Sequence, residues 1–364
     1  MNDGVRCMLM RGGSSKGGYF VESDLPDDPI VRDRLLQRIM GSPDERQIDG
    51  IGGAHPLTSK VAIVAPAADD RADIDYLFLQ IGVDDDVVSD RQNCGNLLAG
   101  VGPFALERGL LAAAGDGRFT VRIRMRNTGS VATARFAVED GAPVYRGATS
   151  ISGVPGAAGP IQLDFEDLAG GTAGALLPTG NVVDTIESIP CTLIDNGMPV
   201  VVLAADAVGI SGYESCHELE QKAGLRKTLE AIRLEAGTLM GLGDVTATTI
   251  PKLTMVAPPR HGGHLSTRTF IPHRCHEAIG VLGAVSVATA ALLDGSPANE
   301  IVVPPDGELV RLEHPTGFFD AIVEVRGGTG GRVEVRRAGI VRTARKLMDG
   351  TVFPRTDEQI GVTT

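Results

Sequence analysis

The chain has 364 residues and a mass of 38.0 kDa, which suits two domains better than a single core. Its 34 basic and 46 acidic residues give a formal charge of −12, which argues against nucleic acid or an anionic membrane surface as the main partner. An anionic ligand therefore requires a local basic cluster.

The predicted elements run in the same order in both halves: strand–turn–strand, helix, two strands, apolar helix, strand–turn–strand. In the first half they cover residues 6–26, 28–42, 60–67, 74–83, 94–115 and 119–141. In the second half they cover residues 190–209, 217–237, 251–259, 264–272, 275–296 and 308–328. This order predicts a duplicated α+β chain.

The spacing of cysteines agrees with a duplication, because 87 residues separate Cys7 from Cys94 and 84 separate Cys191 from Cys275. The helices expected to begin at Cys94 and Cys275 are apolar on nearly all sides and should be buried. We therefore expect two similar domains, each a mostly antiparallel sheet wrapped around a central apolar helix. They should cover 1–185 and 186–364, and the last ~20 residues can return to the first domain. A cleft between them, where the two helix starts face each other, is the expected active site.

The segment Asn93-Cys94-Gly95-Asn96 places a thiol in the first turn of a predicted helix. Helix N–H groups and the helix dipole favour a thiolate there, which indicates an acid–base or nucleophilic cysteine. The alternative is a small buried core thiol, which free cysteine usually is. The flanking Asn and Gly residues favour the functional interpretation, with Asn93, Gly95 and Asn96 as substrate-binding candidates.

A glycine-rich loop leads into Thr58-Ser59-Lys60 immediately before an apolar strand. A lysine between hydroxyls and a buried strand can lose its proton on desolvation and act as a base. Thr58 and Ser59 are substrate-binding candidates beside it. The alternative for Lys60 is a solvated loop lysine.

The segment MRGGSSKGGYF places Arg11, Ser14, Ser15 and Lys16 among glycines. Such a loop can cradle carboxylates or phosphates, although the Walker spacing is missing. We take Arg11, Ser14 and Ser15 as substrate-binding candidates. A hairpin turn with solvated charges is the alternative.

The second half offers further candidates in turns and near the second apolar helix. Asn181 and Met198 lie in Gly-containing turns, which are weak signals alone. The segment PHRCHEAIG contains Arg274 and Cys275 between two histidines, but no second His/Cys pair has ligand spacing. We therefore expect no metal, and Arg274 is interpreted as a carboxylate clamp at a helix start.

Six motifs, in order and over nearly the whole chain, resemble the PrpF-like isomerases, which share the two-domain diaminopimelate-epimerase fold. The motifs are MRGGSSKGGYF, DGIGGAHPLTSKVAIV, NCGNLLAGVGPFA, LLPTGN, IDNGMPVV and IPHRCHEAIGVLGAVSVATA. The resemblance implies that Lys60 and Cys94 flank the substrate carbon that loses or gains a proton. Diaminopimelate epimerases use a cysteine from each domain instead, which leaves Cys275 as a second candidate. The resemblance implies no cofactor.

The reaction that the resemblance implies is keto–enol tautomerisation of 4-oxalomesaconate to 2-hydroxy-4-carboxymuconate, in gallate and protocatechuate breakdown. The alternatives are double-bond isomerisation of 4-oxalomesaconate or 2-methylaconitate, and a non-catalytic protein that binds tricarboxylates. The expected ligand is thus a small unsaturated tricarboxylate. A homodimer is expected on general frequency alone.

No signal for export or membrane insertion is visible in the sequence. The N-terminal segment MNDGVRCMLMRGG lacks a secretory apolar region, and no run reaches the roughly eighteen apolar residues of a membrane span. The five cysteines lack a CxxC pair and are odd in number, which argues against a disulfide framework. We therefore expect reduced thiols in the cytoplasm.

Overall fold

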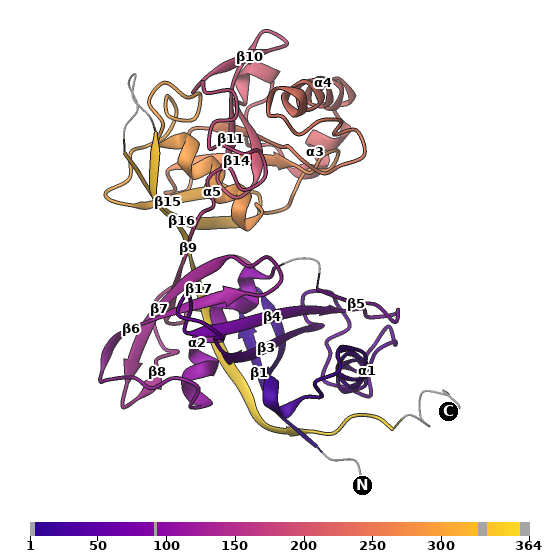
Figure 1. Ribbon diagram of the computed structural model, residues 1–364. Coiled ribbons are helices and arrows are strands. Elements are labelled where there is room, and N and C mark those ends of the chain that lie inside the picture. The colour runs from indigo at the N-terminus through magenta and orange to yellow at the C-terminus, as the bar shows by residue number, and fades with distance from the viewer. Residues whose placement is uncertain (1–3, 91–92, 327–332, 357–364) are drawn as a thin grey trace. The chain divides into compact units, whose positions relative to one another are not determined.

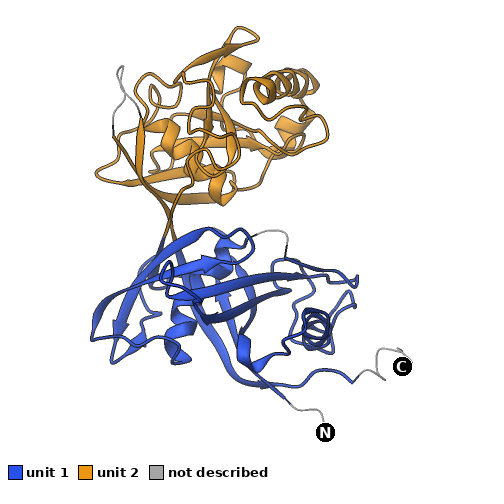
Figure 2. Ribbon diagram, viewed as in Figure 1, with its two compact units in different colours: residues 1–163, 342–364 blue, residues 164–341 orange. Residues whose placement is uncertain are grey.

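The computed structural model describes residues 4–90, 93–326 and 333–356. Figure 2 shows its two compact units: unit 1 comprises Met1–Leu163 and Arg342–Thr364, and unit 2 comprises Asp164–Val341. The boundary expected near residue 185 falls instead inside unit 2, on strand β10 (Asp184–Ile186). The Gly-rich segment before β10 belongs to unit 2 because it bonds to Asp195 of β11 (Ile189–Asp195): the Gly170 N–H donates to the Asp195 carbonyl, and the Asp195 N–H donates to the Leu176 carbonyl.

In unit 1 the strands form a closed ring in the order β1, β2, β3, β4, β6, β7, β9, β17 and back to β1 (Figure 1). The strands are β1 Val5–Gly12, β2 Ser15–Val21, β3 Lys60–Pro66, β4 Ile74–Ile81, β5 Val88–Ser89, β6 Gly117–Met125, β7 Val131–Glu139, β8 Ala142–Pro143, β9 Pro160–Phe165 and β17 Glu334–Val352. Strand β17 begins in unit 2, and its last part pairs antiparallel with β1. The ring therefore depends on residues from both ends of the chain.

The apolar helix of unit 1 is α2 (Gly95–Glu107), and its residues from Leu97 to Leu106 are all buried. It packs against β1, β2, β3, β4, β6, β7 and β8, which a helix apolar on all sides requires. Helix α1 (Pro29–Met40) begins after Asp28, whose carboxylate accepts hydrogen bonds from the backbone N–H groups of Ile30 and Val31. The short 3₁₀ helix η1 (Glu22–Asp24) precedes it.

Alternation along β3 and β4 decides which residues face each helix. Val61, Ile63, Leu77 and Leu79 form one cluster with Leu36, Ile39 and Met40 of α1. The intervening residues of both strands, Lys60 and Gln80 among them, therefore lie on the opposite side, which α2 covers.

Unit 2 repeats the pairing pattern of unit 1. Its strands are β10, β11 Ile189–Asp195, β12 Pro199–Ala204, β13 Lys252–Ala257, β14 Leu265–Phe270, β15 Leu309–His314, β16 Gly317–Arg326 and the start of β17. From β11 to β16, successive strand pairs alternate between antiparallel and parallel, beginning and ending with an antiparallel pair. The unit 1 series β1, β2, β3, β4, β6, β7 alternates in the same way. The order of elements predicted for both halves is thus confirmed.

The helices of unit 2 are η2 Asp206–Val208, α3 Cys216–Gln221, α4 Ala223–Leu239 and α5 Val281–Ala291. Helix α4 packs with β11, β12 and β13 in one core cluster, and the apolar α5 contacts β11, β12, β15 and β16. Within the described ranges, no helix is long and apolar enough to cross a membrane.

Two predicted helices of unit 2 have different bounds. The helix predicted over 217–237 is interrupted at Lys222, whose backbone is not helical. The helix expected to begin at Cys275 begins at Val281, after the N-cap residue Gly280. The reason is that the N–H groups of Cys275 and His276 bond to the Glu220 carboxylate and the Thr269 carbonyl, which holds this segment as a turn. The prediction of two matched cysteines at helix starts was therefore wrong.

Candidate active site

Lys60 is the first residue of β3 and lies between Gly17 of β2 and Gln80 of β4. Only 7% of it is exposed. Its Nζ donates a hydrogen bond to Oε1 of Gln80 at 2.6 Å and lies 4.9 Å from the ring centroid of Phe78. Lys60 is thus a buried amine bonded to a neutral amide, and the solvated alternative is excluded.

Gly17 is required beside Lys60 because a Cβ there would lie 2.3 Å from the Lys60 carbonyl oxygen and 3.1 Å from Leu97. The absence of a side chain lets β2 approach both β3 and α2.

Cys94 is the N-cap residue of α2, with extended backbone torsions, and is 9% exposed. Its carbonyl accepts the N–H of Leu98 at 3.0 Å, the first bond of the helix. The hydroxyl of Tyr76, from β4, also reaches this carbonyl at 3.4 Å. Tyr76, Phe78 and Gln80 are alternate residues of β4, so their side chains lie on one face of the sheet. Lys60 lies on this face because it bonds to Gln80, and the start of α2 meets the same face because Tyr76 bonds to the Cys94 carbonyl.

A second tyrosine fixes the first turn of α2. The Tyr19 hydroxyl donates to the Leu97 carbonyl at 2.6 Å. Burial raises the pKa of both Tyr19 and Tyr76 well above their usual range, so both phenols keep their protons as donors. Two neutral hydroxyls thus position the backbone that carries Cys94.

The asparagines beside Cys94 bond to neighbouring loops. Asn96 donates through Nδ2 to Oγ of Ser14 at 3.2 Å, and Asn93 donates through Nδ2 to Oγ1 of Thr128 at 2.7 Å. The Oδ1 of Asn93 is buried and has no hydrogen-bond partner within the described residues. Gly95 opens the helix. Gln92, which begins the motif QNCGN, lies outside the described residues.

Ser59 supports the loop before Lys60. It is fully buried, with its hydroxyl 2.7 Å from Oε1 of Gln47 and 3.0 Å from the His55 carbonyl oxygen. These contacts satisfy its hydroxyl and support a structural role. Thr58, with its hydroxyl 3.1 Å from the same carbonyl oxygen, lines a cavity instead.

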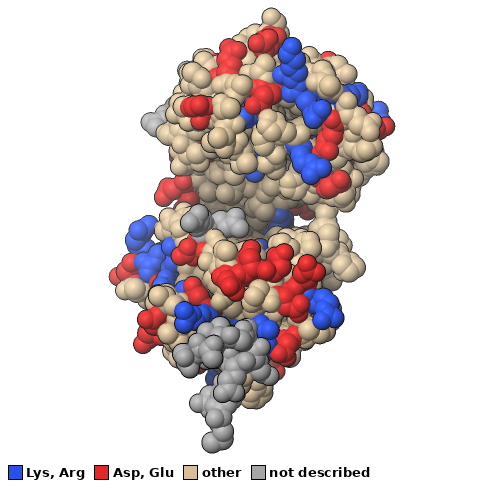
Figure 3. Space-filling model, turned by 90° about the vertical axis from the view of Figure 1, so that its right-hand side faces the viewer, with Lys and Arg blue, Asp and Glu red and all other residues tan. Residues whose placement is uncertain are grey.

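This cavity of about 320 Å³ lies within unit 1 and brings together the candidates Arg11, Ser14, Ser15 and Thr58. Arg11 donates through Nη1 to the carbonyls of Gly13 at 2.7 Å and Thr343 at 2.9 Å. Figure 3 shows a group of acidic side chains on the visible face of unit 1, whereas none of the described residues that line this cavity is acidic. The cavity is thus a local exception to the negative charge of the chain.

Cys275 lies in the core cluster of unit 2 and is 8% exposed. Burial raises its pKa above the usual range, so it is a protonated thiol at neutral pH. Arg274 is largely exposed, with Nε 3.9 Å from Oε1 of Glu220, and it precedes α5 by several residues. The placement of Arg274 at a helix start was therefore wrong.

The remaining candidates of unit 2 have local partners. Asn181 donates through Nδ2 to Asp184 at 2.9 Å. The Met198 carbonyl accepts the Ser286 hydroxyl of α5 at 2.7 Å. These bonds hold the turns in which the two residues lie.

Three residues of this site escaped the sequence reasoning: Tyr19, Tyr76 and Gln80. Gln80 had a signal, because it is a polar residue at the end of the apolar segment IDYLFLQI. Tyr19 and Tyr76 had no such signal in the sequence, since aromatic residues in strands usually belong to the hydrophobic core. Within the described residues there is no group of three or more His, Cys, Asp or Glu side chains that could hold a metal ion.

Residues 3–355 match the family model described as PrpF protein. The chain is 56% identical over 353 residues to (4E)-oxalomesaconate Delta-isomerase of Novosphingobium sp. (strain KA1), covering 96% of this chain and 98% of that one. It is 53% identical over 350 residues to 4-oxalomesaconate tautomerase of Pseudomonas putida, covering 96% and 95%. A crystal structure of methylitaconate-delta-isomerase superposes with a TM-score of 0.90 at 33% identity, covering 100% of this chain and 98% of that one. The expected resemblance is confirmed, and the chain belongs to the PrpF family.

Proposed function

We propose that this PrpF-family isomerase converts 4-oxalomesaconate into its enol, 2-hydroxy-4-carboxymuconate, by acid–base proton transfer with Lys60 and Cys94. The observation that carries the proposal is the geometry of Lys60: it is buried, bonded to an amide rather than a carboxylate, and on the face of β3 that meets the start of α2. Two relatives of more than half identical sequence, named for oxalomesaconate, support the substrate.

The chemistry requires a base, an acid and a site for the intermediate. The keto form has an acidic CH₂ between its carbonyl and its double bond, and one of the two residues removes that proton. The resulting dienolate is stabilised by N–H donors at the start of α2 and by Asn96 and Ser14. Protonation on oxygen then gives the enol.

A second outcome of the same intermediate is double-bond migration, which follows when a distant carbon receives the proton instead of the oxygen. The observation that favours it is the relative named as a Delta-isomerase, at 56% identity. The relatives named 3-methylitaconate isomerase (Eubacterium barkeri) and 2-methyl-aconitate isomerase (Shewanella oneidensis), each 35% identical, extend this alternative to other unsaturated acids. Breakdown of gallate or protocatechuate is the proposed setting of either reaction.

We also propose that the two units are duplicates of one ancestral domain. Two units with the same pairing order, each with a buried apolar helix, support a duplicated architecture of the diaminopimelate-epimerase type.

Incubation with 4-oxalomesaconate in D₂O, followed by NMR and ultraviolet absorbance, tests the function. We expect enzyme-dependent deuterium incorporation together with the absorbance of the enol. Deuterium incorporation with a shifted double bond would favour the migration reaction. Neither product nor exchange, with retained binding, would replace the isomerase by a protein that only binds tricarboxylates.

A further inference from the structure

Three basic residues lie side by side on three adjacent strands of unit 1. Arg11 of β1 is directly opposite Lys16 of β2 and directly opposite Arg345 of β17. Like charges in opposite positions of neighbouring strands repel one another. We call Lys16, Arg11 and Arg345 the cationic row.

The cationic row lines the cavity of about 320 Å³ described above. The segment from Thr149 to Ala158 lines the cavity too, largely with glycine, proline and aliphatic residues, as does Leu347 of β17. The cavity thus combines three cations with apolar walls, and its described lining residues include no carboxylate that could neutralise them.

Within the described residues the charges of the row are not compensated by the protein. Arg11 donates only to main-chain carbonyls, and neither the Lys16 ammonium nor the Arg345 guanidinium has a hydrogen-bond or ion-pair partner. Burial, and then the charge of Arg345, lower the pKa of Arg11, which agrees with an uncompensated positive site.

The cationic row lies on the side of the sheet opposite to Lys60. A Cβ on Gly12 or Gly17 would contact Asn96 or Leu97 of α2, so these two glycines face the helix. Arg11 and Lys16 are their sequence neighbours and therefore point away from it. The row therefore lies outside the face that carries Lys60, whereas Ser14, proposed above to stabilise the dienolate, lines the same cavity as the row.

We propose that the cationic row and its cavity are a binding site for a small oligocarboxylate. Neighbouring strands lie about 4.8 Å apart, so the outer members of the row are about 10 Å apart at the backbone. Carboxylates distributed along a carbon chain match this spacing better than one compact phosphate does. The apolar walls suit the carbon skeleton, and two guanidinium groups suit carboxylate oxygens.

The test is calorimetric titration of the full chain with citrate as the probe, alongside succinate and inorganic phosphate. We expect citrate to bind most tightly, and its Kd to rise about tenfold in Lys16→Ala and in Arg345→Ala, as the loss of one charge-assisted hydrogen bond predicts. Lys227→Ala, which removes an exposed charge from α4 of unit 2, is the control and should leave the Kd unchanged. Circular dichroism confirms that each variant is folded.

Three results would overturn the proposal: no citrate binding by the wild type, equal citrate binding by the row variants, or phosphate binding as tight as citrate. Citrate titration of Lys60→Ala separates this site from the reaction, because binding should persist when turnover is lost. Steady-state kinetics then identify the source of the ligand. If the row holds the substrate's own carboxylates, its variants raise KM and citrate competes; if it holds a second carboxylate, citrate changes the rate without competing.

Discussion

Lys60 lies on the face of the sheet that meets the start of α2, where Cys94 is the N-cap residue, yet the surroundings of the two residues differ: an amide and an aromatic ring for the lysine, a helix start for the cysteine. This asymmetry suits a pair in which one group takes a proton and the other gives it. We expect Lys60→Ala and Cys94→Ser each to lower kcat by about 10² or more, the usual effect of losing an acid–base residue. Steady-state assays with 4-oxalomesaconate measure this. Near-wild-type kcat in both variants would remove both residues from the mechanism.

Gln80 allows a sharper experiment on the role of Lys60. Gln80→Glu would put a carboxylate where Oε1 now accepts from Nζ at 2.6 Å, and an adjacent negative charge favours the ammonium form. If Lys60 is the base, kcat should fall about tenfold or more and the pH–rate profile should move to higher pH. The matched variant Gln80→Met removes the hydrogen bond without adding charge and should leave the profile in place. An unshifted profile in Gln80→Glu would contradict the assignment.

At this scale the sequence pointed to the two residues proposed as acid and base but not to the residues that position them. Lys60 and Cys94 were recognisable because reactive side chains stood beside glycines and asparagines at the ends of apolar segments. Tyr19 and Tyr76 were not, because their value comes from hydroxyls that reach carbonyls of a helix far along the chain. Cys275 was also expected at the start of an apolar helix, but the carboxylate of Glu220, on another element, accepts its N–H group and holds it in a turn.

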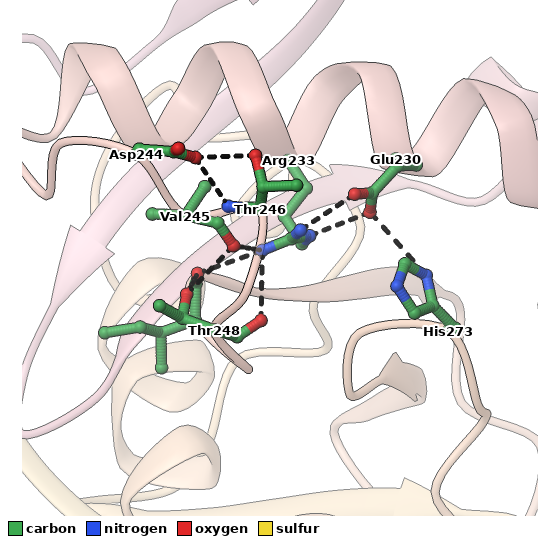
Figure 4. Close-up of polar contacts among 8 residues, drawn as sticks. Glu230, Arg233, Asp244, Val245, Thr246, Thr248 and His273 are labelled. Atoms are coloured by element: carbon green, nitrogen blue, oxygen red, sulfur yellow. Dashed lines mark hydrogen bonds and ion pairs between the residues drawn. The ribbon is translucent and has the colours of Figure 1, made fainter.

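Helix α4 illustrates how one side chain can hold an element in place. Figure 4 shows Arg233, which is fully buried, donating to both carboxylate oxygens of Glu230 at 2.8 Å. It also donates to the carbonyls of Val245 and Ile250 at 2.9 and 3.1 Å. The arginine thereby fastens the segment after α4 to the helix.

Arg233→Met should lower the free energy of unfolding of unit 2 by about 3 kcal/mol, because it removes the bidentate partner of the Glu230 carboxylate and a buried donor to the carbonyls of Val245 and Ile250. Urea unfolding followed by circular dichroism measures this. Arg226→Met, at an exposed position of the same helix, is the control and should change stability little. Equal stabilities of the two variants would show that the network contributes nothing.

The same ion pair predicts a dependence on pH. Hydrogen bonds from Arg233 lower the pKa of Glu230, so the folded state binds this proton less readily than the unfolded state does. The stability that the pair contributes is complete above the unfolded value of roughly 4.3 and is lost as the pH falls through the lower folded value. Glu230→Gln should therefore show a shallower decrease of Tm than the wild type below about pH 4.3. Parallel decreases in calorimetry would contradict this.

Element order was predictable because each strand and apolar helix carries its own periodicity. Element bounds in unit 2 were not, because they depend on contacts distant in sequence. The segment before α5 reads as helix, yet the Glu220 carboxylate and β14 take its N–H groups. Similarly, a single amphipathic pattern covers α3 and α4, and only the backbone of Lys222 shows the interruption.

For the molecule as a whole, the discontinuity of unit 1 has a direct test. A chain that ends at Val341 keeps the residues of β17 that pair with β16 but loses those that pair with β1, from Ala344 to Val352. We expect unit 1 to lose its closed ring and unit 2 to remain folded, because the core cluster of α4 lies entirely within unit 2. Limited proteolysis with mass spectrometry should then yield a resistant fragment near residues 164–341 and degraded unit 1.

The matched control ends at Thr356 and retains every described strand. It should resist proteolysis in both units and keep its activity. If the chain that ends at Val341 also keeps unit 1 resistant and active, the pairing of β17 with β1 is dispensable.

The ring of unit 1 also bears on the order in which the chain acquires its structure during translation. Strand β1 is made before all the other described strands, and its partner in β17 is made after them. Unit 2, a continuous segment, is complete before that partner exists, and domains generally fold as units during synthesis. Unit 1, which holds Lys60 and Cys94, is thus begun before unit 2 and completed after it, so a ribosome that stops before Ala344 releases a chain in which the ring of unit 1 cannot close.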